Sequence, residues 1–72
     1  MNAEELYKKG MDYSHAGNID QAFPYFVKAA NQGHPDAQAY LGYIYEFGYG
    51  VTKDLQKAAY WKKKYEENPN KE

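Results

Sequence analysis

The chain has 72 residues, a net charge of −1 and no cysteine, which predicts one small domain spanning residues 1–72. The balanced charge argues against binding to nucleic acid or to an anionic membrane, and no apolar run approaches the ~20 residues of a membrane span. Without cysteine, disulfides and thiolate metal sites are excluded, and we expect a reducing, cytoplasmic location. The polar and acidic residues 1–5 are not typical of a secretion signal.

The first predicted helix covers roughly residues 2–16. Leu6, Gly10 and Tyr13 are spaced i, i+4 and i+7, which places them on one helix face. Gly17 can take the left-handed conformation that ends a helix. Leu, Ile, Val and Phe together number only 10 of 72 residues, whereas Tyr alone numbers 9. We therefore expect Ala and Gly to let helices approach and tyrosine rings to fill the space at the edges.

The second predicted helix covers roughly residues 19–32, with Asn18 or Asp20 as its N-cap. Pro24 removes a helical hydrogen bond, so we expect a late start, with Pro24 in the first turn, or a local bend. Gly33 ends the helix. The residues expected to face inward are Ala22, Phe26, Ala29 and Ala30.

The third predicted helix covers roughly residues 35–47. Pro35 suits its first turn, and His34 precedes it as an N-cap or turn residue. Gly48 and Gly50 in the following segment can take positive φ. The residues expected to face inward are Ala37, Leu41, Ile44 and Tyr45.

The fourth predicted helix covers roughly residues 54–67, with Asp54 as its N-cap. Asn68 and Pro69 end it, and we expect a frayed tail over residues 68–72. The apolar face of this helix consists of Leu55, Ala58, Trp61 and Tyr65.

An internal repeat relates the first two helices to the last two. Two residues, Gly10 and Tyr13, recur 32 residues later as Gly42 and Tyr45. Three more recur 36 residues later: Ala22, Tyr25 and Lys28 correspond to Ala58, Trp61 and Lys64. The difference of four residues places an insertion in the turn of the second unit. The sequence therefore predicts an all-α fold of two helical hairpins.

The second hairpin carries an ordered motif, Leu41-Gly42-x-x-Tyr45-x-x-Gly48-x-Gly50-Val51-x-x-Asp54-x-x-Lys57-Ala58-x-x-Trp61. On this motif, residues 35–64 resemble one full Sel1-like repeat, a relative of the tetratricopeptide repeat. Residues 3–34 resemble a tetratricopeptide-like hairpin through Gly10, Tyr13 and the run 16–22. The resemblance implies a short right-handed α-solenoid of two antiparallel hairpins that acts as a protein-interaction module.

The end of the second hairpin differs from the end of the first. The run 64–66 reads Lys-Tyr-Glu where the run 28–30 reads Lys-Ala-Ala. Paired alanines let a following helix sit close, whereas Tyr and Glu suit a solvent-facing end. We therefore expect residues 35–67 to act as a terminal capping unit.

The resemblance also implies a binding surface. In tetratricopeptide-like folds the first helix of each hairpin lines a concave face, and the motif positions carry over from Gly10 and Gly42. Aromatic and apolar side chains with acidic flanks could take an apolar or basic segment of another protein. That these residues pack against one another instead is equally open. The implied peptide-binding residues are Glu4, Tyr7, Met11, Ser14, Asp36, Ala39, Tyr43 and Glu46.

Other kinds of site have little support in the sequence. His15 and His34 lie in different connections without metal-ligand spacing, so no metal site is expected. The lysines at 62–64, beside Tyr60 and Tyr65, are better explained as a solvated helix end than as a nucleic-acid patch. No P-loop, GxSxG or dinucleotide-binding turn is present, so we predict neither an enzyme nor a cofactor.

These observations predict an adaptor that binds a peptide or helix of a partner protein through the concave face of the first helices. The alternative is a helical scaffold without small-molecule chemistry, natural or engineered, that either stands alone or associates with itself into homo-oligomers. It stays open because two repeats fall short of the about three that usually make a stable array. Either the aromatic core suffices for two repeats, or the chain self-associates, or it was cut from a longer array.

Overall fold

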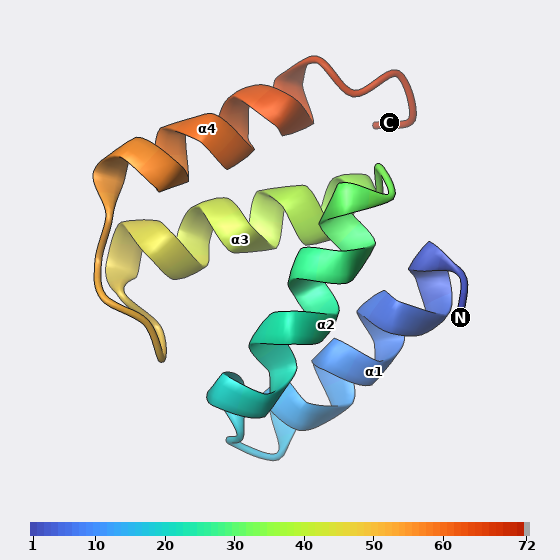
Figure 1. Cartoon of the computed structure of the whole chain (residues 1–72), viewed down its shortest axis with the longest axis vertical. Helices are drawn as coiled ribbons and strands as arrows, with labels where there is room; N and C mark the ends of the chain where they lie inside the picture. The colour runs from blue at the N-terminus through green and yellow to red at the C-terminus, as the bar shows by residue number, and fades with distance from the viewer. Residues whose placement is uncertain (72) are drawn as a thin grey trace.

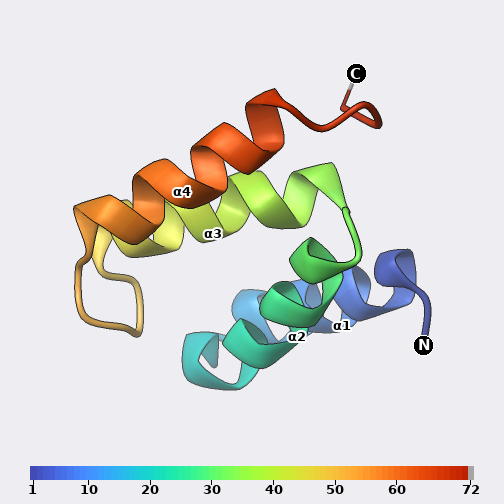
Figure 2. The same ribbon diagram turned by 45° about the horizontal axis from the view of Figure 1, so that its top comes forward.

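Four α-helices make up the computed structural model, which describes residues 1–71 (Figure 1). They are α1 (Ala3–His15), α2 (Ile19–Asn31), α3 (Pro35–Phe47) and α4 (Leu55–Glu66). Each helix packs against the next along the chain. Two hairpins result, α1 with α2 and α3 with α4, and Figure 2 shows them as two layers. The predicted all-α fold of two stacked hairpins is confirmed.

Side-chain caps explain where helices begin. Asn2 and Glu5 form a capping box before α1: the Glu5 amide donates to Asn2 Oδ1 over 2.8 Å, and the Asn2 amide donates to Glu5 Oε1 over 2.9 Å. Asp54 accepts a hydrogen bond from the amide of Lys57 over 3.0 Å, which confirms it as the N-cap of α4. Asn18 stands at the N-cap of α2 without a side-chain hydrogen bond.

Pro24 lies inside α2 rather than in its first turn. The helix begins at Ile19 and continues to Asn31, so the predicted late start is wrong. The missing N–H of Pro24 leaves the carbonyl of Asp20 without its helical hydrogen bond. Both residues are exposed, so water can hydrate that carbonyl, and the helix tolerates proline on its outer side.

The core lies where α2 meets α3. Its largest fully buried side chains are Phe26, Leu41 and Ile44. Tyr40 is half-buried and stacks on Phe26, with ring centroids 4.7 Å apart. Tyrosine rings therefore surround a small apolar centre, as expected of side chains whose hydroxyls need water or a partner. The other buried residues of this cluster are Leu6, Ala22, Ala29, Ala30 and Ala37.

The predicted apolar face of α4 is wrong at Leu55, which is 62 % exposed. Trp61 and Tyr65 are half-buried, and Ala58 is the helix's one buried residue. The reason is that α4 packs mainly on α3 alone, so its contact strip is narrow. Leu55, at the first helical position, falls outside that strip.

Two glycines set the geometry of the second hairpin. A Cβ atom at Gly42 would lie 2.8 Å from Cγ of Lys62 and 3.5 Å from the carbonyl oxygen of Ala58, so α3 and α4 approach closely there, as predicted. In the turn between these helices, Gly50 has φ +71°. A Cβ atom at Gly50 would lie 2.5 Å from Cγ2 of Ile19. The turn therefore rests against the start of α2 and ties the two hairpins together.

Asn68 anchors the chain beyond α4. Its Nδ2 donates to the carbonyl of Gly33 and to Oε1 of Gln38, both over 2.8 Å. Gln38 is itself buried and donates to the carbonyl of Ala30 over 3.1 Å. The predicted frayed tail over 68–72 is therefore wrong at Asn68, because its side chain satisfies buried polar groups of the hairpin junction. Residue 72 of that prediction lies outside the described residues.

Candidate functional site

His34 connects the start of α1 to the start of α3. Its Nδ1 accepts a hydrogen bond from the amide of Ala37 over 3.2 Å, so the ring caps α3 and carries its proton on Nε2. Nε2 donates to Glu4 Oε1 over 2.8 Å, and this hydrogen bond lowers the pKa of Glu4. The ring also stacks on Tyr7, with centroids 4.5 Å apart. Glu4 and Tyr7 therefore already have partners within the chain, since both contact His34.

The other predicted groove residues of α1 are engaged in the same way. Ser14 Oγ lies 3.3 Å from the hydroxyl of Tyr40 on α3, and Met11 packs against the core. Burial raises the pKa of the Tyr7 hydroxyl, and the nearby charge of Asp36 adds to that rise. On the first hairpin, Tyr7 and Ser14 thus contact α3 or His34, which caps it, and Glu4 is hydrogen-bonded to His34 although it stays exposed.

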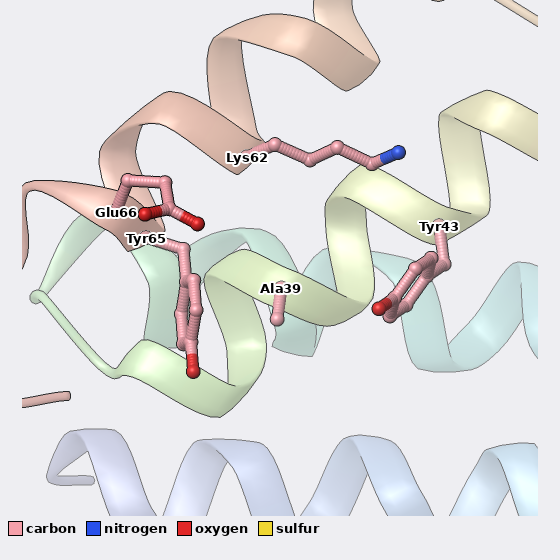
Figure 3. Close-up of a pocket in the computed structure, with 5 residues that line it drawn as sticks. All are labelled: Ala39, Tyr43, Lys62, Tyr65 and Glu66. Atoms are coloured by element: carbon pink, nitrogen blue, oxygen red, sulfur yellow. The ribbon is translucent and has the colours of Figure 1, made fainter. Parts of the chain in front are cut away.

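An open hollow lies on the second hairpin, between α3 and α4. It measures about 280 Å³ and has a floor at Ala39, with the rings of Tyr43 and Tyr65 on either side (Figure 3). Tyr43 is 52 % exposed. Lys62 and Glu66 complete the lining from α4. Apolar surface here is flanked by one cation and one carboxylate, a pattern that suits an amphipathic ligand.

Ion pairs hold the charged side chains at the edge of this hollow. The Lys62 ammonium donates to Glu46 and lies 5.6 Å from the centroid of the Tyr43 ring, a cation–π distance. Glu66 pairs with Lys71 over 3.3 Å. Lys62 is therefore oriented before any ligand binds.

Exposed rings continue from the hollow along α3 and into the turn that follows it. We define the aromatic ridge as Tyr43, Phe47 and Tyr49. The Tyr43 and Phe47 centroids lie 6.5 Å apart, and those of Phe47 and Tyr49 lie 5.6 Å apart. Each ring is more than half exposed. Contiguous exposed aromatic surface of this kind is typical of protein-interaction sites.

The structure thus divides the eight predicted residues into two groups. In the first group, Glu4, Tyr7 and Ser14 contact His34 or Tyr40. Met11 packs against the core, and Asp36 is exposed with its charge near the Tyr7 hydroxyl. The second lies at the hollow or beside it and consists of Ala39, Tyr43 and Glu46.

Sequence reasoning missed the contribution of α4 to the hollow. Its residues, Lys62, Tyr65 and Glu66, stand 36 positions after Phe26, Ala29 and Ala30. The repeat spacing could have revealed them. Phe26, Ala29 and Ala30 are buried under α3 in the first hairpin, so the equivalent residues of the second hairpin are expected to line a surface where no helix packs.

Residues 1–71 show neither the features of a metal site nor those of a membrane-spanning helix. Residues 1–71 hold no group of three or more His, Asp or Glu side chains placed to share a metal ion. Across the same residues, no helix combines the length and the apolar character needed to cross a membrane.

Known proteins resemble this chain over most of its length. The model of the Sel1 repeat matches residues 3–34 and 35–64. The chitin synthase regulator SKT5 of Saccharomyces cerevisiae is 35 % identical over 65 residues, which is 90 % of this chain and 9 % of that protein. The DAP3-binding cell death enhancer 1 of Rattus norvegicus and of Mus musculus is 41 % identical over 49 residues, 68 % of this chain and 10 % of each relative.

The chain therefore spans about a tenth of the length of these relatives. No solved structure gives a significant match. The tetratricopeptide-like character predicted for residues 3–34 is refined, because the Sel1 model matches this hairpin as well as the second one. The chain belongs to the Sel1 repeat family, whose repeats are generally protein–protein interaction modules.

Proposed function

We propose that this chain binds a peptide or helix of a partner protein in the hollow between α3 and α4, as an adaptor without catalysis. The observation that carries the proposal is the open floor at Ala39 between the rings of Tyr43 and Tyr65. The names of the relatives agree with such a role: one is a regulator of chitin synthase and the other binds DAP3.

The α3 part of the predicted concave face is the part that remains open to a ligand. On α1, Tyr7 is stacked on His34, and Ser14 contacts Tyr40, so a ligand there would have to displace the chain's own contacts. At Tyr43 no such displacement is needed. Burying apolar surface at the hollow contributes about 25 cal/mol per Å², before the entropy cost of association.

Peptide selection tests this proposal directly. A displayed library of random peptides is selected on the purified chain, and the winners are measured by calorimetry against the wild type and against Tyr43→Ala. We expect Tyr43→Ala to weaken binding at least about tenfold, the loss typical of an aromatic residue at the centre of an interface. In nuclear magnetic resonance spectra of the wild type, the largest shifts should fall on Ala39, Tyr43 and Tyr65.

Tyr60→Ala is the matched control. Tyr60 is 55 % exposed, lies on α4 and does not line the hollow. Its removal should leave peptide affinity unchanged. The proposal fails if selected peptides bind Tyr43→Ala as tightly as the wild type, or if no peptide can be selected at all.

A further inference from the structure

The hollow occupies a position that the first hairpin also has. Each of its five lining residues has a counterpart at the repeat spacing of 32 residues for α3 or 36 residues for α4. The α3 residues Ala39 and Tyr43 correspond to Tyr7 and Met11. The α4 residues Lys62, Tyr65 and Glu66 correspond to Phe26, Ala29 and Ala30. We call this set of positions the seat of each hairpin.

The seat of the first hairpin is occupied by a helix, namely α3. Tyr40 of α3 stacks on Phe26 at 4.7 Å. Gln38 of α3 donates to the carbonyl of Ala30 over 3.1 Å. At the start of α3, His34 stacks on Tyr7. Contacts from the first half of α3, and from His34 just before it, thus fill the first seat, while the equivalent seat on the second hairpin is open.

We propose that the open seat takes an amphipathic α-helix of a partner protein, lying on α3 and α4 as α3 lies on α1 and α2. The helix carries an acidic side chain at the position equivalent to Tyr40. This inference rests on the proposed function and adds the conformation and the charge of the ligand. The inference follows from the first hairpin, where the equivalent surface is seen with a helix bound to it.

The acidic side chain follows from the change of residue in the seat. The position that is Phe26 in the first seat is Lys62 in the second. Tyr40 stacks on the ring of Phe26, but its equivalent would meet an ammonium group that Glu46 and the Tyr43 ring already orient. An ammonium has three N–H donors, so Lys62 can bind a second carboxylate while it keeps Glu46.

The opposite charge is expected nearer the start of the bound helix. Glu66 stands where the first seat has Ala30, whose carbonyl accepts from Gln38. A basic side chain near the position of Gln38 would therefore meet the Glu66 carboxylate. Pairing of the ligand's acidic side chain with Lys62 and of its basic side chain with Glu66 also fixes the direction of the bound helix. In the reversed direction, each charge of the ligand would lie beside a like charge of the chain.

A second copy of the chain fits this seat poorly. In head-to-tail stacking, α1 of the second copy would take the place that α3 has on the first hairpin. The residue of α1 equivalent to Tyr40 is Lys8, which is exposed. Lys8 would then face Lys62, and like charges at an interface select against that partner. Charge complementarity therefore favours an acidic helix of another protein.

The test uses α3 itself as the probe. A peptide of residues 34–47 is held helical by a hydrocarbon staple between positions 39 and 43, because short isolated helices are marginal in water. The staple faces away from the buried residues of α3, Ala37, Leu41 and Ile44, and leaves the Tyr40 side chain free. Three versions carry Tyr40, Tyr40→Glu and Tyr40→Lys, and their affinities for the purified chain are measured by calorimetry.

We expect Tyr40→Glu to bind most tightly and to exceed Tyr40→Lys by about fivefold, the upper range for an exposed ion pair. In the chain variant Lys62→Phe, which restores the residue of the first seat, the order should reverse in favour of the Tyr40 peptide. The control Lys63→Phe changes a neighbouring exposed lysine outside the hollow and should keep the wild-type order.

Two results overturn the inference and leave the hollow as a binding site: equal affinities for all three helical peptides, or failure of all three while library peptides still bind in a Tyr43-dependent manner. Head-to-tail dimers that form in sedimentation experiments and dissociate in Tyr43→Ala would make a second copy the occupant and would also overturn it. Loss of Tyr43-dependence for every peptide rejects the proposed function itself.

Discussion

Replacing Asn68 by alanine should destabilise the domain more than any other single change beyond the end of α4. Asn68 is 8 % exposed, and its Nδ2 donates to two acceptors at the junction of the hairpins, the Gly33 carbonyl and Gln38 Oε1. In Asn68→Ala both acceptors lose this donor. The two losses differ in size, because the acceptors differ in their access to water.

The magnitude follows from that difference. Gly33 is half-exposed, so water can replace the donor and the loss is about 1 kcal/mol, the net contribution of an ordinary hydrogen bond. Gln38 is 4 % exposed, so its Oε1 stays unsatisfied at a cost of about 2 kcal/mol. The free energy of unfolding should therefore fall by about 3 kcal/mol, a large part of the stability of a domain this small.

Urea unfolding followed by circular dichroism measures this effect. The midpoint should fall while the slope with urea stays constant, because the surface exposed on unfolding hardly changes. Asn70→Ala is the control: Asn70 is exposed, and only its backbone amide contacts Asn68. Asn68→Asp should be at least as harmful as Asn68→Ala, since a carboxylate would face two acceptors. If Asn68→Ala unfolds at the wild-type midpoint, Asn68 does not anchor the chain.

Two further predictions concern the turns and the pH. In urea unfolding, Gly50→Ala should lower the free energy of unfolding more than Gly17→Ala. Both glycines have positive φ, where a Cβ atom costs about 1 kcal/mol, but only at Gly50 would the Cβ atom also clash with Ile19. Equal losses in the two variants would show that the contact with Ile19 is unimportant. Hydrogen bonding from His34 lowers the pKa of Glu4 below its ordinary 4.5, so the resulting stabilisation is complete above pH 4.5 and disappears as the pH falls through the lower, folded value. Thermal unfolding of the wild type and Glu4→Gln should therefore converge in acid; a constant gap between them would contradict the Glu4–His34 hydrogen bond.

Much of the fold could be predicted because local rules and packing agree. Ala22, Phe26, Ala29 and Ala30 follow helical spacing and are all buried. Asp54 caps α4 as its residue type suggests. In these places a single helix contains enough information, since the cap or the buried face is set by residues a few positions apart.

Predictions failed where the outcome depends on a distant neighbour. Asn68 belongs to a polar segment with no periodicity, and its role exists only because Gln38 lies buried 30 residues earlier in the chain. Leu55 continues a convincing apolar face, but α4 lacks a second helix to bury it. Neither fact can be read from the segment in which the residue stands.

The candidate site shows the same distinction more sharply. The motif assigns Tyr7 and Tyr43 to similar surfaces, yet Tyr7 is stacked on His34 and Tyr43 is exposed. The difference arises because one hairpin has a helix seated on it and the other does not. Equivalent positions of a repeat thus serve as core in one unit and as surface in the other. The change from Phe26 to Lys62 suits that difference, since an ammonium in an open seat remains solvated and can still bind an acidic helix, whereas an exposed phenylalanine would favour non-specific association.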